Sequence, residues 1–175
     1  MLPTISLSQI AQFNDKEVRL RGWVRRHRSK GKLQFLTIRD GTGELQAILS
    51  KADMDEGQFR AASHLTQESS IEVTGRVRVD SRAPGGYELD VSKIRVFQVA
   101  EPFPIQPKEH GVNFLMDHRH LWLRSSRQHA ILKIRHEIVK ASRDFFDDRE
   151  FVLIDTPIFT PNACEGTTTL FQTQY

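Results

Sequence analysis

The sequence predicts an α+β protein that begins with a small β-barrel. Short runs of alternating apolar and polar residues recur through roughly the first hundred residues, and a helical pattern separates the third run from the fourth. Five strands with a helix in that position are the layout of an oligonucleotide-binding (OB) barrel. Periodicity alone also allows an SH3-like barrel or a small sandwich. The five expected strands are 18–25, 34–40, 45–49, 71–79 and 87–99.

Each element of this region has its own local signal. In 18–25 the small and apolar residues stand at every second position, with polar residues between them. Gly41-Thr42-Gly43 predicts the turn before the third strand, because glycine tolerates positive φ. Residues 54–65 hold few strand formers and predict a short helix. The sequence Ala83-Pro84-Gly85-Gly86 predicts the turn before the last strand.

A proline-rich segment marks the clearest boundary in the chain. Three prolines lie between Glu101 and Pro107, where they can join neither a strand ladder nor a helix interior. We therefore expect a barrel domain over 1–101, a linker or hinge over 102–124, and a second domain over 125–175.

The pattern changes to a helical period after the linker. Apolar residues recur at steps of three and four from 125 to 146, which predicts a helix of about six turns with Ser125 or Ser126 as its N-cap. Residues 151–154 are apolar and predict a buried strand, ended by Thr156-Pro157. One helix and one strand cannot close a core, so this region is expected to need further chain or a partner.

Composition restricts the class of protein and its compartment. The chain has 175 residues and a net charge of only +3, although its pI is about 9.2, so a basic surface must be local. The single cysteine, Cys164, excludes an internal disulfide and favours a reducing compartment. No apolar run is long enough to span a bilayer, and the N-terminus lacks the features of a signal peptide. We expect a cytoplasmic protein with no membrane partner.

The strongest functional signal is a local excess of positive charge beside an aromatic residue. Seven lysines and arginines, and no acid, lie between Arg19 and Lys32. A basic loop is usually just solvated, and a strand phenylalanine is usually core. Together, on the strands that an OB barrel leaves open, they indicate a site for unpaired nucleic acid, with cations on phosphates and an aromatic under a base. The candidate residues are Arg25, Arg26 and Arg28 at the end of the first strand and in the loop after it, Phe35 on the second strand, and Gln46 on the third.

A metal site is not expected. The segment Asp117-His118-Arg119-His120 holds two histidines, but they point to opposite sides if the segment is extended. No further ligand spacing accompanies them, so the sequence predicts no metal ligand.

Several stretches resemble a known family. Arg21–Arg26 (RGWVRR), Leu33–Gly41 (LQFLTIRDG) and Leu45-Gln46 resemble the anticodon-binding domain of class II aspartyl- and asparaginyl-tRNA synthetases. The similarity continues past the linker, where Pro107–Gly111, Phe114–Arg124 and Glu165–Thr168 look like the bacterial asparaginyl enzymes in particular. The resemblance covers nearly the whole chain.

The resemblance assigns roles in the barrel. Phe35 matches the aromatic that stacks on the central uracil of the anticodon, and Gln46 matches the glutamine that reads anticodon bases. Arg25, Arg26 and Arg28 match the basic residues around that loop. The partner implied is the anticodon stem-loop of tRNA(Asn).

The resemblance also assigns the second region to the start of a class II catalytic domain, an antiparallel sheet with helices. The helix 125–146 and the strand after it match motif 1, which builds a homodimer in the family with Pro157 near the two-fold axis. Residues 162–168 match the loop that closes over the amino acid, and Glu165 matches the glutamate that pairs with the substrate ammonium group.

The family reaction attaches asparagine to tRNA in two steps, through asparaginyl-adenylate, with ATP and Mg²⁺. Motifs 2 and 3, which hold ATP, are missing from these 175 residues. We therefore expect no catalytic residue and no ATP or Mg²⁺ site in this chain, and no activity from it alone. The alternatives are an aspartyl-tRNA synthetase, which would charge one or both tRNAs, a non-catalytic OB module for single-stranded nucleic acid, and a non-catalytic dimerising paralogue.

Overall fold

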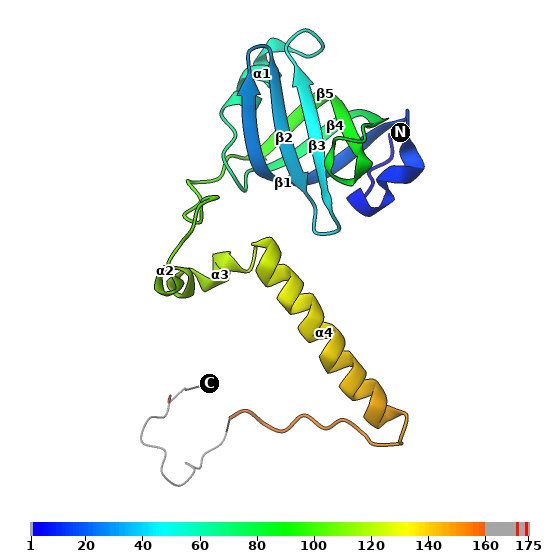
Figure 1. Ribbon diagram of the computed structural model, residues 1–175, viewed down its shortest axis with the longest axis vertical. Helices are drawn as coiled ribbons and strands as arrows, with labels where there is room; N and C mark the ends of the chain where they lie inside the picture. The colour runs from blue at the N-terminus through cyan, green and yellow to red at the C-terminus, as the bar shows by residue number, and fades with distance from the viewer. Residues whose placement is uncertain (1, 160–170, 172–173, 175) are drawn as a thin grey trace. The chain divides into compact units, whose positions relative to one another are not determined.

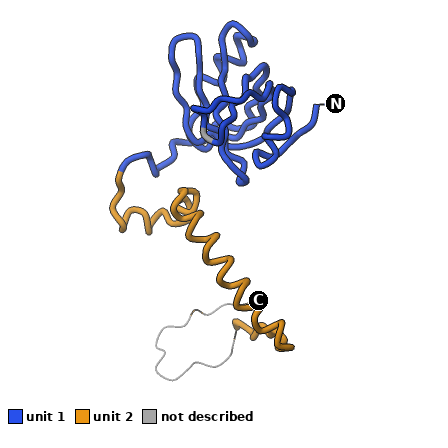
Figure 2. The backbone as a smooth tube through the Cα atoms, turned by 45° about the vertical axis from the view of Figure 1, so that its right-hand side comes forward, with its two compact units in different colours: residues 1–108 blue, residues 109–175 orange. Residues whose placement is uncertain are grey.

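The computed structural model describes residues 2–159, 171 and 174. It divides into two compact units, Met1–Lys108 and Glu109–Tyr175 (Figure 2). The first unit is a closed five-stranded barrel, and the described part of the second is helical.

The barrel has the predicted OB arrangement (Figure 1). Its strands follow the order β1-β2-β3-β5-β4, and only β3 and β5 pair in parallel. Helix α1 (Glu56–Ser63) lies between β3 and β4 in the chain, as predicted, and the Asp55 carboxylate caps it by accepting from the Gln58 amide at 3.0 Å. The strands are β1 (Glu17–Lys30), β2 (Leu33–Arg39), β3 (Glu44–Ser50), β4 (Ser70–Val79) and β5 (Tyr87–Gln98).

Strand β1 is long and serves two neighbours. Residues 17–23 pair with β4, and residues 23–30 pair with β2. Gly22 lies near the change of partner, where a Cβ atom would stand 2.6 Å from the Arg39 carbonyl oxygen, so this crossing requires glycine. The sequence predicted that this strand ends at Arg25, but β1 continues to Lys30. Arg26 and Arg28, which were expected in a loop, therefore lie on β1. Pairing with β2 keeps them in the ladder.

The barrel interior is apolar and contains residues from every strand. Short 3₁₀ helix η1 (Leu7–Phe13) adds Leu7 to this core, and its Leu7 amide donates to Asp40 Oδ2 at 2.7 Å. A second 3₁₀ turn, η2 (Pro84–Gly86), leads into β5. The largest apolar side chains that are fully buried are Leu20, Leu36, Ile38, Leu45, Leu49, Ile71 and Leu89.

The second unit contains three helices within its described residues: α2 (Val112–Asp117), α3 (Arg119–Trp122) and α4 (Ser126–Asp147). Helix α4 is the long helix that the sequence predicted, and Ser125 is its N-cap, with Oγ accepting from the Gln128 amide at 3.4 Å. Its apolar stripe is exposed, as in Ile134 at 62% and Ile138 at 61%. None of the described residues from 109 to 159 is buried.

The predicted buried strand at 151–154 is not observed. These residues form no strand, and Val152 and Ile154 are 83% and 78% exposed. A strand needs a neighbour to satisfy its backbone hydrogen bonds, and the described part of this unit offers none. Across the described residues, no helix has both the length and the apolar character needed to cross a membrane.

Candidate nucleic-acid interface

The candidate residues of the barrel gather on the outer surface of β1, β2 and β3. We call this surface the Phe35 face. It is arranged in cross-strand rows, because directly opposed residues of neighbouring strands project to the same side. One row joins Arg28, Phe35 and Ile48, and the next joins Arg26, Thr37 and Gln46.

A bulge in β1 places the arginines on this face. Up to Val24 the even-numbered side chains point into the barrel, so strict alternation would also turn Arg26 and Arg28 inward. The register with β2 shifts between Val24 and Arg26, and Arg25 is the extra residue. The bulge reverses the alternation, and Arg26 and Arg28 lie outside. The sequence pattern held no signal for the bulge beyond the two consecutive arginines.

Phe35 lies on the outer surface and is half-buried, while its neighbours Gln34 and Leu36 point inward. The guanidinium of Arg28, directly opposite in the ladder, lies 4.9 Å from the centre of its ring. This cation–π contact holds the ring beside a positive charge. An aromatic and a cation in contact on an open strand are the elements with which OB barrels bind an unpaired base and its phosphate.

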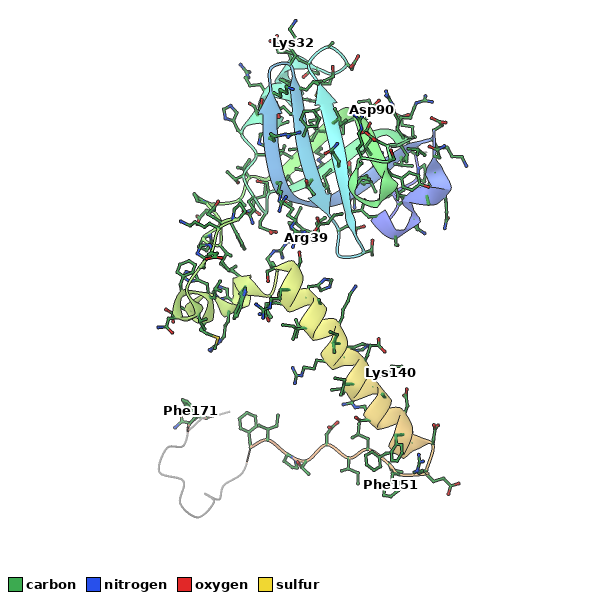
Figure 3. The ribbon with its side chains drawn as sticks, viewed as in Figure 1. Lys32, Arg39, Asp90, Lys140, Phe151 and Phe171 are labelled. Atoms are coloured by element: carbon green, nitrogen blue, oxygen red, sulfur yellow. The ribbon has the colours of Figure 1, made fainter. Side chains whose placement is uncertain are left out.

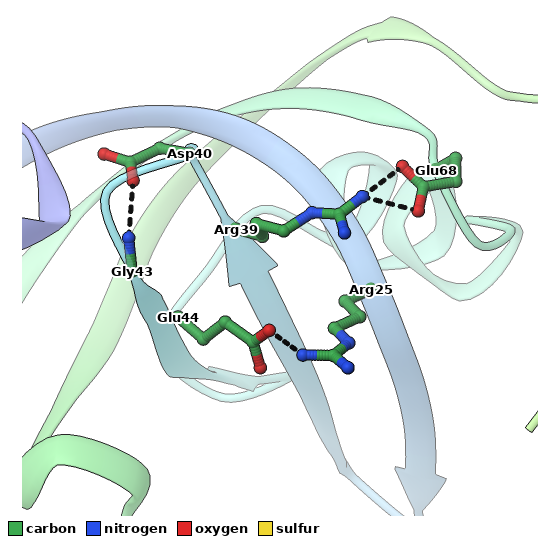
Figure 4. Close-up of polar contacts among 6 residues, drawn as sticks. All are labelled: Arg25, Arg39, Asp40, Gly43, Glu44 and Glu68. Atoms are coloured by element: carbon green, nitrogen blue, oxygen red, sulfur yellow. Dashed lines mark hydrogen bonds and ion pairs between the residues drawn. The ribbon is translucent and has the colours of Figure 1, made fainter. Parts of the chain in front are cut away.

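Ion pairs fix one end of the face (Figure 4). Arg25 pairs with Glu44, and Arg39 Nη2 donates to both carboxylate oxygens of Glu68 at 2.7 and 2.9 Å. Burial lowers the pKa of the Arg25 guanidinium, and the positive charges of Arg39 and Arg26 lower it further. Arg39 was not among the predicted site residues. Its spacing of two and four residues from Thr37 and Phe35 was the signal that could have placed it on the same face.

The remaining polar candidate, Gln46, lies in the middle of the face. Its Nε2 atom is 3.5 Å from Glu88 Oε2 on β5, at the long limit of a hydrogen bond. An amide in this position offers both a donor and an acceptor to a base edge. In Figure 3, Lys32 lies at the tip of the β1–β2 hairpin and Arg39 at the other end of β2, so basic residues mark both ends of the face.

A groove borders the Phe35 face. Its volume is about 560 Å³, and Leu33, Ile48 and Ser50 line one part of it. The other part is charged, with Arg78 paired to Asp90. The groove adjoins the face through Ile48, which stands opposite Phe35 in the ladder.

A buried polar network supports the face from the inside. Gln34 is 1% exposed, and its Nε2 donates to the Phe59 carbonyl at 2.9 Å. The ring nitrogens of His27 lie 3.2 Å from Gln34 Oε1 and 3.2 Å from the Leu65 carbonyl. These contacts tie α1 and the segment after it to the two strands that carry Arg28 and Phe35.

The structure does not bring the candidate residues of the second unit together in a site. Pro157 lies in an exposed segment after α4. Glu165 lies outside the described residues. No group of three or more histidine, cysteine or acidic side chains that could hold a metal ion occurs within 2–159, 171 and 174.

Comparison with known families matches both halves of the chain. Residues 18–97 match the OB-fold nucleic acid binding domain family of tRNA anticodon binding, and residues 111–175 match the class II tRNA synthetases for D, K and N. The first match lies within the first unit of the structure, and the second match lies within the second unit.

Individual relatives agree. The chain is 54% identical over 175 residues to asparagine–tRNA ligase of Roseiflexus sp. strain RS-1, and 54% identical over 174 residues to that of Sorangium cellulosum. Among solved structures, asparaginyl-tRNA synthetase from Pyrococcus horikoshii complexed with asparaginyl-adenylate matches with a TM-score of 0.85 and 36% identity, over 100% of this chain and 41% of that one. The chain spans about 40% of the length of the curated relatives it matches.

Proposed function

We propose that the chain belongs to the class II asparaginyl-tRNA synthetase family and carries the anticodon-recognition part of an asparagine–tRNA ligase, which its similarity to these enzymes supports. The observation that supports this proposal most directly is the Phe35 face. It combines an outward aromatic ring, a cation 4.9 Å from that ring, and an amide one row away. These are the groups that stack on a base, pair with its phosphate and read its edge.

In the proposed complex, the anticodon of tRNA(Asn) lies across β1, β2 and β3. Phe35 stacks on the central uracil, a contact worth about 1–3 kcal/mol. Arg26 and Arg28 neutralise phosphates, and Arg25 joins them from its pair with Glu44. Gln46 hydrogen-bonds a base edge, which makes it the residue of the set that can discriminate between sequences.

The proposal extends to the whole protein. The whole protein would activate asparagine with ATP, release pyrophosphate, and transfer the asparaginyl group to the terminal ribose of tRNA in the cytoplasm. ATP and Mg²⁺ are the cofactors of that reaction, and Mg²⁺ would spread the charge of the phosphates. This chain contributes positioning of the tRNA. We propose no catalytic or ATP-binding residue within these 175 residues.

The second unit has two proposed roles. Helix α4 and Pro157 form part of a homodimer interface, which is supported by the exposed apolar stripe along α4. Glu165 pairs with the ammonium group of asparagine, because a carboxylate accepts several charge-assisted hydrogen bonds from one cation.

A binding titration tests the anticodon proposal. The chain should bind an asparagine anticodon stem-loop more tightly than the same stem-loop with its central uracil replaced. Phe35→Ala should weaken binding of the asparagine stem-loop by roughly 5- to 150-fold, the equivalent of about 1–3 kcal/mol. The free energy of unfolding should change little, because the ring is on the outer surface.

Phe145→Ala is the matched control. Phe145 lies on α4 with the Arg149 guanidinium 3.6 Å from its ring centre, so the pair repeats the Phe35–Arg28 contact outside the barrel. This variant should bind RNA like the unchanged chain. Equal affinity for the asparagine stem-loop and for random single strands would instead indicate a general single-strand binder. Preference for an aspartate anticodon would indicate the aspartyl alternative.

A further inference from the structure

A second basic and aromatic surface lies on the other side of the barrel, on β1, β4 and β5. We call it the Trp23 face. Its rows follow from the strand register: Arg19 faces Thr74, which faces Lys93, and the next row joins Arg21, Glu72 and Arg95. These side chains point outward, because the residues between them on each strand are buried.

Positive charge dominates this face. The two rows hold four cations, Arg19, Arg21, Lys93 and Arg95, and one carboxylate, Glu72. Arg21 Nε donates to Glu72 at 2.7 Å, and Arg19 Nε lies 3.8 Å from the other carboxylate oxygen. The hydrogen bond from Arg21, reinforced by the charges of Arg21, Arg19 and Arg95, lowers the pKa of Glu72. One carboxylate cannot neutralise four cations, so the face keeps an excess of positive charge.

Two large aromatic side chains border these cations. Trp23 is 42% exposed and Phe97 is 46% exposed. The Arg95 guanidinium lies 5.0 Å from the centre of the Phe97 ring, which repeats the arrangement of Arg28 and Phe35. Partly exposed aromatic rings on strands that also carry arginines are typical of surfaces that bind nucleic acid.

The Trp23 face is continuous with the Phe35 face. Trp23 pairs with Ser70 on one side of β1 and with Arg39 on the other. Along the outer side of β1, Arg19 and Arg21 therefore lead through Trp23 to Arg25, Arg26 and Arg28. At about 3.3 Å per residue, the strand from Arg21 to Arg28 measures roughly 23 Å. A chain of phosphates that leaves the Phe35 face along β1 meets cations over this whole length.

We propose that the Trp23 face binds the phosphate backbone of the RNA stem that flanks the bases held by the Phe35 face. This inference rests on the proposed anticodon function. The net positive charge selects a polyanion, and continuity along β1 selects the same RNA molecule. An acidic protein segment covering the face is the competing occupant, and the experiment separates the two.

The test compares two RNA probes on the intact chain. One is a heptanucleotide with the sequence of the anticodon loop, and the other is the same loop closed by a five-base-pair stem. The double variant Lys93→Gln/Arg95→Gln should weaken binding of the stem-loop by about tenfold and flatten its salt dependence by roughly one to two units of log–log slope. Binding of the heptanucleotide should not change.

A charge-matched control removes two exposed cations elsewhere, Arg60→Gln/Lys133→Gln. If this control weakens the stem-loop equally, or if Lys93→Gln/Arg95→Gln leaves the stem-loop unchanged, the inference is wrong. Loss of heptanucleotide binding in the β5 variant would also contradict it. A different result would contradict the anticodon proposal: Phe35→Ala would leave binding of the heptanucleotide unchanged.

Fluorescence gives a second readout that does not need the β5 variant. The chain has two tryptophans, Trp23 and Trp122, so Trp122→Phe leaves Trp23 as the only indole. The stem-loop should change the emission of Trp23 more than the heptanucleotide does, because only the stem reaches past it. Equal changes with both probes, or no change with either, would overturn the proposal.

Discussion

The barrel and the helical unit use the same kinds of apolar residues in opposite ways. In the barrel, Leu20 and Leu36 are at most 1% exposed, whereas Ile134 and Ile138 of α4 are more than half exposed. Both sets of apolar residues recur at the spacing expected for their secondary structure, which is two in a strand and three or four in a helix. The barrel strands each pair with two neighbours and close on themselves, but the stripe of α4 has no covering layer within the described residues. Periodicity identifies which side chains favour burial, and closure decides whether they are buried.

The same contrast applies to the arginine–phenylalanine contacts. Arg28 and Phe35 lie in one row of a sheet, next to Arg26 and Gln46, and a buried network supports them. Phe145 on α4 and Arg149 just after it make a closer contact but have no such surroundings within the described chain. A cation–π pair becomes a candidate site through the surface around it.

Truncation of a large apolar side chain should show the largest difference in stability effect between the two units. Leu36→Ala removes a fully buried side chain from the barrel and should lower the free energy of unfolding by about 2–5 kcal/mol. In the monomer, Ile138→Ala removes a similar side chain that is 61% exposed and should cost less than about 0.5 kcal/mol. Urea unfolding measures both. A comparable cost for Ile138→Ala would show that the α4 stripe is covered in solution.

Polar groups should show the same dependence on burial. Gln34→Leu leaves His27 and the Phe59 carbonyl without their partner and should lower the free energy of unfolding by about 1–3 kcal/mol. Gln46→Leu, a change of the same size on the outer surface, should alter this free energy little and should weaken RNA binding instead. If the two variants unfolded at the same urea concentration, the network would not support the barrel as described.

Charge removal should affect RNA binding only in the barrel. Arg28→Gln should weaken the asparagine stem-loop by about three- to tenfold and flatten the log–log salt slope by roughly 0.7 to 0.9, which corresponds to one phosphate contact. Arg149→Gln is the matched change just after the C-terminus of α4, and it should leave affinity and slope unchanged. Titrations at several salt concentrations measure both quantities. Equal slopes for the two variants would remove Arg28 from the phosphate contacts.

The smallest expected effect concerns pH. The folded-state pKa of Glu72 lies below its ordinary value of 4.5 because of its hydrogen bond from Arg21 and the nearby arginines. Its contribution to stability is therefore present above about pH 4.5 and is lost as the pH falls through the folded-state pKa. Glu72→Gln should lower Tm by roughly 1–4 °C at pH 7, and the difference should shrink towards zero in acid.

The matched control for this pair lies on α4. Asp144 forms a solvent-exposed pair with Lys140 one helical turn away, so Asp144→Asn should leave Tm essentially unchanged at pH 7. A Tm difference for Glu72→Gln that persisted unchanged at low pH would show that its carboxylate charge is not the cause.

Much of the fold could be predicted because each element carries a local signal. The turn at Gly41, the period of α4 and the Ser125 cap are properties of short stretches, and the structure contains them. The strand at 151–154 was wrong for the opposite reason. Its apolar residues favour burial, but a strand exists only with a partner, and partners are not a local property.

The sequence by itself determined the order of the barrel elements, the helix after the proline-rich segment, and the resemblance to asparaginyl-tRNA synthetases, because alternation, capping and motif residues all lie within short windows of chain. Only the tertiary structure decided which arginines share a surface with Phe35. A single extra residue at Arg25 reverses the direction of every side chain after it on β1, and such a bulge depends on the register with β2. Only the tertiary structure shows that Arg19 and Arg21 share a face with Lys93 and Arg95, residues more than seventy positions away in the chain, because the register across β4 places them in the same rows.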